Sequence, residues 1–297
     1  MTIESRFSIS EISTVAASFA EDLDAFREAG AAGIGIWEFK LADDEAALKR
    51  FAESGLVATH CVPAVPSILP LPELEGPEEP EVRVEAICSG IQRLAAFEPE
   101  AILCLTGPRG ERSEEDARAT VVEGLRRIAD EASKAGVRMS VEPIQERFAE
   151  SWTLISTIPA TLDLLEEVGK PELGVFFDTW HLWNTEGLLE QIERHASRFA
   201  GVHVADWREP TRMNADRVLP GDGVARLPAI LGALERAGYR GWYDVEIFSD
   251  TGLEDSLWAL PPREFAARAR RSFLRVWAAR TSVGEPMVPP RASSFEA

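Results

Sequence analysis

Four residues of the types that bind divalent metals or transfer protons close apolar segments in the second half of the sequence. They are Glu142, Asp178, His203 and Glu246. Three carboxylates brought together without a cation repel one another, so their joint ionisation is unfavourable. A divalent ion removes that repulsion, and three carboxylate oxygens with one imidazole nitrogen suit Mn²⁺, Co²⁺, Mg²⁺ or Zn²⁺. These residue types therefore indicate one divalent ion, with coordination positions left for water or substrate.

Taken singly, three of the four residues have an ordinary structural explanation. Glu142 could simply end a strand, Asp178 could cap the turn that follows it, and His203 could be a hydrogen-bonded core histidine. Glu246 is different because it lies between Val and Ile, and an ionised carboxylate inside an apolar strand needs a partner. Their joint occurrence at equivalent places in successive segments favours a functional role.

The elements that must position these residues alternate regularly. Strands are predicted near residues 7–10, 33–39, 56–61, 101–105, 137–141, 173–177, 201–205 and 242–247. Helices are predicted near residues 12–29, 43–54, 81–97, 113–135, 158–168, 186–199, 225–237 and 262–279. Strands that are apolar on both faces and separated by helices favour a parallel sheet. Eight such units in 297 residues indicate a single closed (β/α)8 TIM barrel over residues 1–280, with a short C-terminal tail at 281–297.

Enzymes built on such a barrel place their active sites at the carboxyl ends of the strands. The four residues therefore converge on one side of the predicted barrel. Trp37 and His60 also lie at predicted strand ends, so we expect them to contact substrate. An indole can stack on the apolar face of a sugar, although it could equally fill the barrel rim, and the alternative for His60 is a structural role.

Five short motifs, spread over the four barrel units of the second half, carry a resemblance to a known family. They are V-E-P at 141–143, F-D-T-W-H at 177–181, H-V-A-D at 203–206, D-R-V-L-P-G-D-G at 216–223 and D-V-E-I-F at 244–248. The chain resembles the xylose-isomerase-like TIM-barrel superfamily of sugar phosphate isomerases and epimerases. The R-x-x-P-G-D-G stretch is similar to the inosose isomerase branch.

The resemblance implies a role for each matched residue. Glu142, Asp178, His203 and Glu246 would bind the metal, and Glu142 and Glu246 would also transfer protons. His181 and Arg217 would contact substrate oxygens, with His181 taking part in catalysis. In related ketose epimerases the arginine lies closer to the strand-seven histidine, so Arg208 remains a second candidate for this role.

These residues predict a sugar or cyclitol isomerase or epimerase that works by carboxylate-mediated proton transfer. An ion, Mn²⁺ by preference, would stabilise the enediolate formed when an α-hydroxy carbonyl compound loses its α-proton. Elimination begins with the same step, so a lyase is the alternative. It would be an inosose-type dehydratase, or the catalytic subunit of a C-glycoside deglycosidase acting on a 3-keto sugar.

Composition argues against several other classes of protein. Lys and Arg number 31 and Asp and Glu 50, a net charge of −19 that disfavours nucleic acid and anionic membranes as partners. An endonuclease IV-like protein would need more metal-binding histidines than the four present. The three cysteines fit no metal or redox motif, and no secretory signal or spanning segment is recognisable. We therefore expect a cytoplasmic protein with a small carbohydrate or cyclitol substrate, acting as a homo-oligomer or as a hetero-oligomer with a small subunit.

Overall fold

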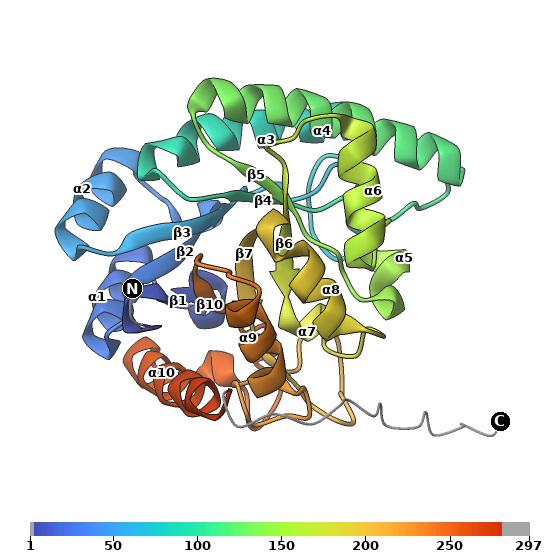
Figure 1. Cartoon of the computed structure of the whole chain (residues 1–297). Coiled ribbons are helices and arrows are strands. Elements are labelled where there is room, and N and C mark those ends of the chain that lie inside the picture. The colour runs from blue at the N-terminus through green and yellow to red at the C-terminus, as the bar shows by residue number, and fades with distance from the viewer. Residues whose placement is uncertain (1–2, 281–297) are drawn as a thin grey trace.

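A closed barrel of parallel strands forms the centre of the computed structural model, which describes residues 3–280 (Figure 1). Its strands are β1 (Phe7–Ser10), β2 (Gly33–Trp37), β3 (Val57–Val62), β4 (Ile102–Cys104), β5 (Met139–Val141), β6 (Gly174–Asp178), β7 (Phe199–Val204) and β10 (Tyr243–Val245). Hydrogen bonds connect them in the circular order β1-β10-β7-β6-β5-β4-β3-β2. The predicted (β/α)8 barrel is thus confirmed, while the predicted tail at 281–297 lies outside the described residues.

Helices surround the barrel and cover the outer face of its strands (Figure 1). They are α1 (Phe19–Ala29), α2 (Asp44–Ser54), α3 (Pro80–Leu94), α4 (Glu114–Ala135), α5 (Ala149–Trp152), α6 (Ile158–Val168), α7 (Thr179–Leu182), α8 (Leu188–His195), α9 (Leu227–Arg236) and α10 (Pro262–Ala279). The strands are buried almost throughout, as expected for a parallel sheet with helices outside and side chains filling the inside.

Local sequence explains where several helices begin. Ser113 caps α4 by accepting a hydrogen bond from the backbone N–H of Asp116. Residues 12–29 were predicted as one helix, but α1 begins only at Phe19. Ser18 and Glu21 form a capping box there, and a short 3-10 helix at Glu11–Thr14 precedes it.

The segment after β7 contains structure that the sequence did not predict. No strand or helix was predicted between residues 205 and 225, yet β8 (Asp206–Trp207) and β9 (Arg217–Val218) form an antiparallel pair there. Strands of two residues are too short for hydrophobic periodicity to reveal. This pair determines where Arg217 lies.

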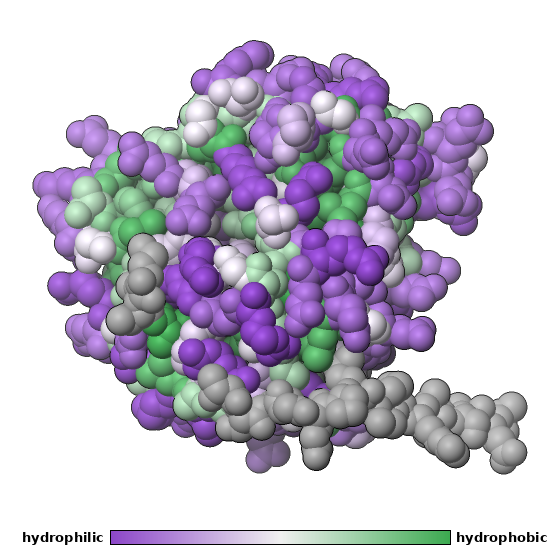
Figure 2. Space-filling model, in the orientation of Figure 1, coloured by the Kyte–Doolittle hydropathy of each residue, from purple (hydrophilic) through white to green (hydrophobic). Residues whose placement is uncertain are grey.

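The surface carries both polar and apolar side chains (Figure 2), and the three cysteines are unpaired. Over residues 3–280, no helix has both the length and the apolar character required to cross a bilayer. On the face drawn in Figure 2, hydrophilic side chains surround scattered apolar patches. Cys61 and Cys104 are buried and Cys88 is half-buried, and all three are free thiols.

Candidate active site and metal centre

The four predicted metal ligands come from neighbouring strands of the barrel. Glu142 directly follows β5, Asp178 ends β6, His203 is the penultimate residue of β7, and Glu246 directly follows β10. These strands are adjacent in the barrel, and Asp178 is in register with His203. All four side chains are buried. The parallel topology therefore brings together residues that are up to 104 positions apart, from 142 to 246.

The distances between their polar atoms are those of a compact cluster. His203 Nδ1 lies 3.1 Å from Glu246 Oε2 and 3.5 Å from Glu142 Oε1. One potential ligand atom from each of Asp178, His203 and Glu246 lies within 4.8 Å of the others. Glu142 forms a second such group with Asp178 and His181. Asp178 belongs to both groups, so the two overlap in space.

Burial controls the protonation of this cluster. It raises the pKa of Glu142 and of Glu246 well above the usual range; neighbouring carboxylates raise both further, and the positive charge of Arg217 opposes part of the rise. Burial also lowers the pKa of His203 to about 3, so its imidazole is neutral at physiological pH. Without a cation, the site disfavours negative charge on its glutamates and positive charge on its imidazole.

Two buried atoms of the cluster lack a hydrogen-bond partner among the described residues, and both point to a cation. They are Glu142 Oε1 and His203 Nδ1. When the neutral His203 ring carries its proton on Nε2, which lies 3.1 Å from Nε2 of a second imidazole, Nδ1 presents a lone pair to the oxygens of Glu142 and Glu246. Acceptors facing one another in a buried site are unfavourable unless a proton or metal ion lies between them. The oxygen and nitrogen donors present fit a divalent ion.

Arg217 places a permanent positive charge beside the same carboxylates. Its Nη1 donates to Asp178 Oδ2 at 2.8 Å and to Glu246 Oε2 at 3.1 Å. The guanidinium lies over the rings of Trp180 and Phe248, at 4.8 and 4.9 Å from their centroids. The β8–β9 pair thus delivers a fixed donor to the acidic cluster.

His181 follows the end of β6 on the short helix α7. Its Nε2 lies 3.3 Å from Arg217 Nη2, and its Nδ1 accepts a hydrogen bond from the backbone N–H of Gln145 at 3.4 Å. Burial, together with the charge of Arg217, lowers the pKa of His181 well below its usual value. His181 is therefore a neutral hydrogen-bonding group beside the carboxylates.

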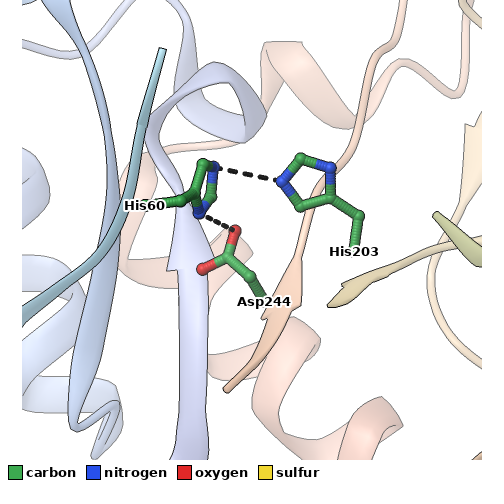
Figure 3. A group of neighbouring side chains, drawn as sticks. All are labelled: His60, His203 and Asp244. Carbon is green, nitrogen blue, oxygen red and sulfur yellow. Dashed lines mark hydrogen bonds and ion pairs between the residues drawn. The ribbon is translucent and has the colours of Figure 1, made fainter. Parts of the chain in front are cut away.

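His60 lies inside the barrel, against His203 (Figure 3). The Nε2 atoms of the two rings are 3.1 Å apart. His60 Nδ1 lies 3.3 Å from Thr59 Oγ1 and 4.0 Å from Asp244 Oδ2. Gly35 on the neighbouring strand leaves room for this ring, because a Cβ there would lie 2.2 Å from His60 Cε1. His60 was predicted to contact substrate, but the structure directs it to His203 instead.

A cavity of about 450 Å³ opens above this cluster. Its lining includes Glu142, Glu246, His181 and Arg217, together with the predicted Trp37. Neither His60 nor Arg208 is among the lining residues. Arg208 pairs instead with Asp216 and Asp255, at 3.0 and 2.9 Å. Of the two candidate arginines, the structure therefore brings Arg217 to the cavity.

A family profile of the xylose isomerase-like TIM barrel matches residues 23–277. The chain belongs to this family. Over 183 residues it is 30% identical to hydroxypyruvate isomerase of Escherichia coli (strain K12), which covers 60% of this chain and 67% of that protein. Inosose dehydratase of Geobacillus thermodenitrificans (strain NG80-2) is 26% identical over 166 residues, covering 51% of this chain and about half, 52%, of that protein.

The fold of this xylose isomerase-like barrel also matches a crystal structure of the IolI protein with a bound zinc atom. The TM-score is 0.76 at 16% identity, and the match covers 94% of this chain and 100% of the other. At that identity the likeness concerns the arrangement of the barrel.

Two buried acids of this xylose isomerase-like barrel were not predicted as site residues. Asp244 lies two residues before Glu246, so both point into the barrel, and burial raises the pKa of Asp244 to about 8. Asp206 accepts hydrogen bonds from the backbone N–H groups of Trp207, Gly221 and Ala225. These hydrogen bonds hold together the two ends of the segment that carries Arg217. A carboxylate inside an apolar strand was the available signal for Asp244.

Proposed function

We propose that this protein is a divalent-metal-dependent isomerase or epimerase of small α-hydroxy ketones or aldehydes, such as sugars or cyclitols. The observation that carries the proposal is the pair of atoms without a hydrogen-bond partner in the described part of the chain, Glu142 Oε1 and His203 Nδ1, which lie 3.5 Å apart. His203 Nδ1 also lies 3.1 Å from Glu246 Oε2, and both glutamates line the cavity. Glu142, Asp178, His203 and Glu246 would hold the ion, for which Mn²⁺ is our first choice. When bound, it supplies a Lewis acid that stabilises negative charge on substrate oxygens.

The protein's own carboxylates would move the proton. One of Glu142 and Glu246 takes the α-proton of the substrate, which leaves an enediolate. The other returns a proton to the opposite face of the same carbon, giving an epimer, or to the neighbouring carbon, giving an isomer. Both carboxylates line the cavity, so one can accept a proton from a bound substrate and the other can return one.

Arg217 and His181 would stabilise and orient the substrate oxygens. Both line the cavity, and both present N–H groups or ring nitrogens next to the carboxylates. A guanidinium fixed between two aromatic rings needs no reorganisation when charge develops on an oxygen. The similarity to hydroxypyruvate isomerase supports this proposal.

A dehydratase is the second candidate, supported by the similarity to inosose dehydratase. Elimination begins with the same removal of an α-proton and then expels hydroxide from the next carbon. The residues described here would carry out the shared first step in either enzyme.

The test is α-proton exchange in D₂O, followed by NMR, with hydroxypyruvate and inosose as substrates. Mn²⁺-loaded protein should exchange the α-proton of at least one of them, and metal-free protein should not. Mass spectrometry then separates an isomerase from a dehydratase, because only the dehydratase releases water. Glu246→Gln should abolish exchange, whereas Glu123→Gln on the exposed face of α4 should not. Exchange at the wild-type rate in Glu246→Gln would remove the proton-transfer role.

A further inference from the structure

The cavity above the carboxylate cluster is apolar over most of its wall. We infer that the substrate carries an apolar ring or chain attached to its α-hydroxy carbonyl end, and that this part lies against an aromatic wall formed by Trp37, Phe39, Phe248 and Trp258. The inference rests on the proposed function, because it places the reacting end of the substrate at Glu142 and Glu246.

The aromatic wall is continuous. The centroid of the Trp37 ring lies 5.9 Å from that of Phe39 and 5.9 Å from that of Phe248. Phe248 continues to Trp258 at 6.2 Å. All four side chains line the cavity. Together they present one extended apolar surface to a ligand.

This wall has no free hydrogen-bonding groups for the hydroxyls of a substrate. Trp37 Nε1 donates to Ser10 Oγ at 2.9 Å, and Trp258 Nε1 donates to the carbonyl oxygen of Ile247 at 2.9 Å. The side chains of Phe39 and Phe248 have no polar atoms. The wall therefore offers ring faces and C–H edges alone.

The rest of the lining separates polar groups from apolar ones. Glu142, His181, Arg217 and Glu246 are buried together, whereas Glu73, Glu75 and Asn214 are exposed to solvent. Other lining residues are aliphatic or proline, among them Val62, Pro66, Leu103, Leu105 and Ile144. A hydroxyl that lay against the aromatic wall would lose its water without regaining a hydrogen bond there. A ligand that is polar at one end and apolar at the other matches this arrangement of polar and apolar lining residues.

Two large apolar side chains of the lining are also exposed to solvent. Phe39 is 52% exposed and Leu74 is 42% exposed. Near them, Asn214 Nδ2 donates to Glu73 Oε1 at 3.1 Å, which joins the segment after β3 to the segment before β9. Exposed apolar side chains that border a cavity indicate a ligand or partner that covers them. A substrate whose apolar part extends outward from the carboxylates would cover both.

The experiment compares two α-hydroxy ketones that differ in their substituent. Erythrulose carries a polyol chain next to the reacting group, and 2-hydroxyacetophenone carries a phenyl ring. Binding to the Mn²⁺-loaded protein is measured by titration calorimetry, and α-proton exchange in D₂O by NMR. We expect 2-hydroxyacetophenone to bind at least about tenfold more tightly. Equal or tighter binding of erythrulose would overturn the inference.

Variants at the rim of the cavity provide the second measurement. Phe39→Ser and Leu74→Ser should each weaken binding of 2-hydroxyacetophenone severalfold and leave that of erythrulose unchanged. The control is Val82→Ser, which removes an apolar side chain that is 48% exposed on α3 and outside the cavity lining. If the rim variants instead dissociate an oligomer, measured by light scattering, and leave both affinities unchanged, the exposed side chains form a subunit interface and the inference is wrong.

The outcomes separate this inference from the proposed function. Tight binding of 2-hydroxyacetophenone without exchange of any α-proton, in these ketones or in hydroxypyruvate and inosose, contradicts the isomerase and supports the apolar subsite. Exchange with erythrulose and weaker binding of the phenyl ketone contradict the apolar subsite and support the isomerase. Failure of every ligand to bind contradicts both.

Discussion

The imidazoles of His60 and His203 face each other across the barrel interior, with their Nε2 atoms 3.1 Å apart. Burial lowers the pKa of both rings, so both are neutral and each carries one N–H. An Nε2–H on His203 that donates to Nε2 of His60 leaves Nδ1 of His203 free for a metal ion. The proton of His60 then lies on Nδ1, towards Thr59 Oγ1 and Asp244. His60 is in this way a positioning residue for His203.

Replacing His60 should weaken metal binding. His60→Phe keeps a ring of similar shape but removes the acceptor for the Nε2–H of His203. Loss of such a partner typically lowers metal affinity about 10–100-fold. The measurement is competition for Mn²⁺ against a fluorescent chelator. His60→Gln, whose amide oxygen can replace Nε2 as acceptor, should restore much of the affinity. Wild-type affinity in His60→Phe would contradict the positioning role.

Arg217 and Arg208 should differ sharply in their effects on activity. Arg217→Gln removes a cavity donor aimed at the substrate oxygens, so kcat/KM for α-proton exchange should fall about 10²–10³-fold. Affinity for the metal should not fall, because a like charge is removed from its surroundings. Arg208→Gln is the matched control, since its guanidinium pairs with Asp216 and Asp255 outside the cavity lining. A large fall in kcat/KM in Arg208→Gln, with little change in Arg217→Gln, would assign the substrate contact to Arg208.

Asp206 should be required for the stability of the segment that carries Arg217. Its two oxygens accept three backbone hydrogen bonds in a buried position, and an amide cannot accept on its nitrogen side. Asp206→Asn should therefore lower the free energy of unfolding by about 1–3 kcal/mol, measured with urea. Asp255→Asn, at a half-exposed side chain, is expected to have a smaller effect. An equal decrease in the free energy of unfolding in the two variants would contradict the stabilising role of the buried Asp206 carboxylate.

Glu11 should make stability depend on pH. Burial raises the pKa of its carboxyl well above the usual value. The folded protein then holds a proton that the unfolded chain releases, so this contribution is complete below the unfolded pKa of about 4.3 and is lost as pH rises through the folded pKa. Glu11→Gln imitates the protonated form. Its stability relative to wild type should therefore increase with pH, in urea titrations from about pH 4 to 8.

Glu21 provides a control of opposite sign. Hydrogen bonds from Ser18 lower the pKa of its carboxyl. Its contribution to stability is present above the unfolded pKa and is lost as pH falls. Glu21→Gln should therefore be less stable than wild type at neutral pH, and the difference should disappear in acid. A stability difference from wild type that changes with pH in the same direction in both variants would contradict one of the two assignments, and the direction of the change shows which one.

The sequence alone was sufficient for the barrel and for the convergence of four residues. Alternating apolar segments and helical patterns predicted parallel strands, and parallel strands present their carboxyl ends on one side. Residues at strand ends, such as Glu142 and Glu246, were therefore expected on the same side of the barrel. The information required was local: segment type, order and the last residue of each segment.

Only the tertiary structure decided what each neighbouring side chain contacts. The direction of His60 depends on the space left by Gly35 on the next strand, which no pattern around His60 records. Arg217 reaches the carboxylates because β8 and β9 pair, and strands of two residues carry no periodicity of their own. Contacts of this kind are set by packing between segments that are distant in the chain, whereas hydrophobic patterns report the burial of each segment by itself.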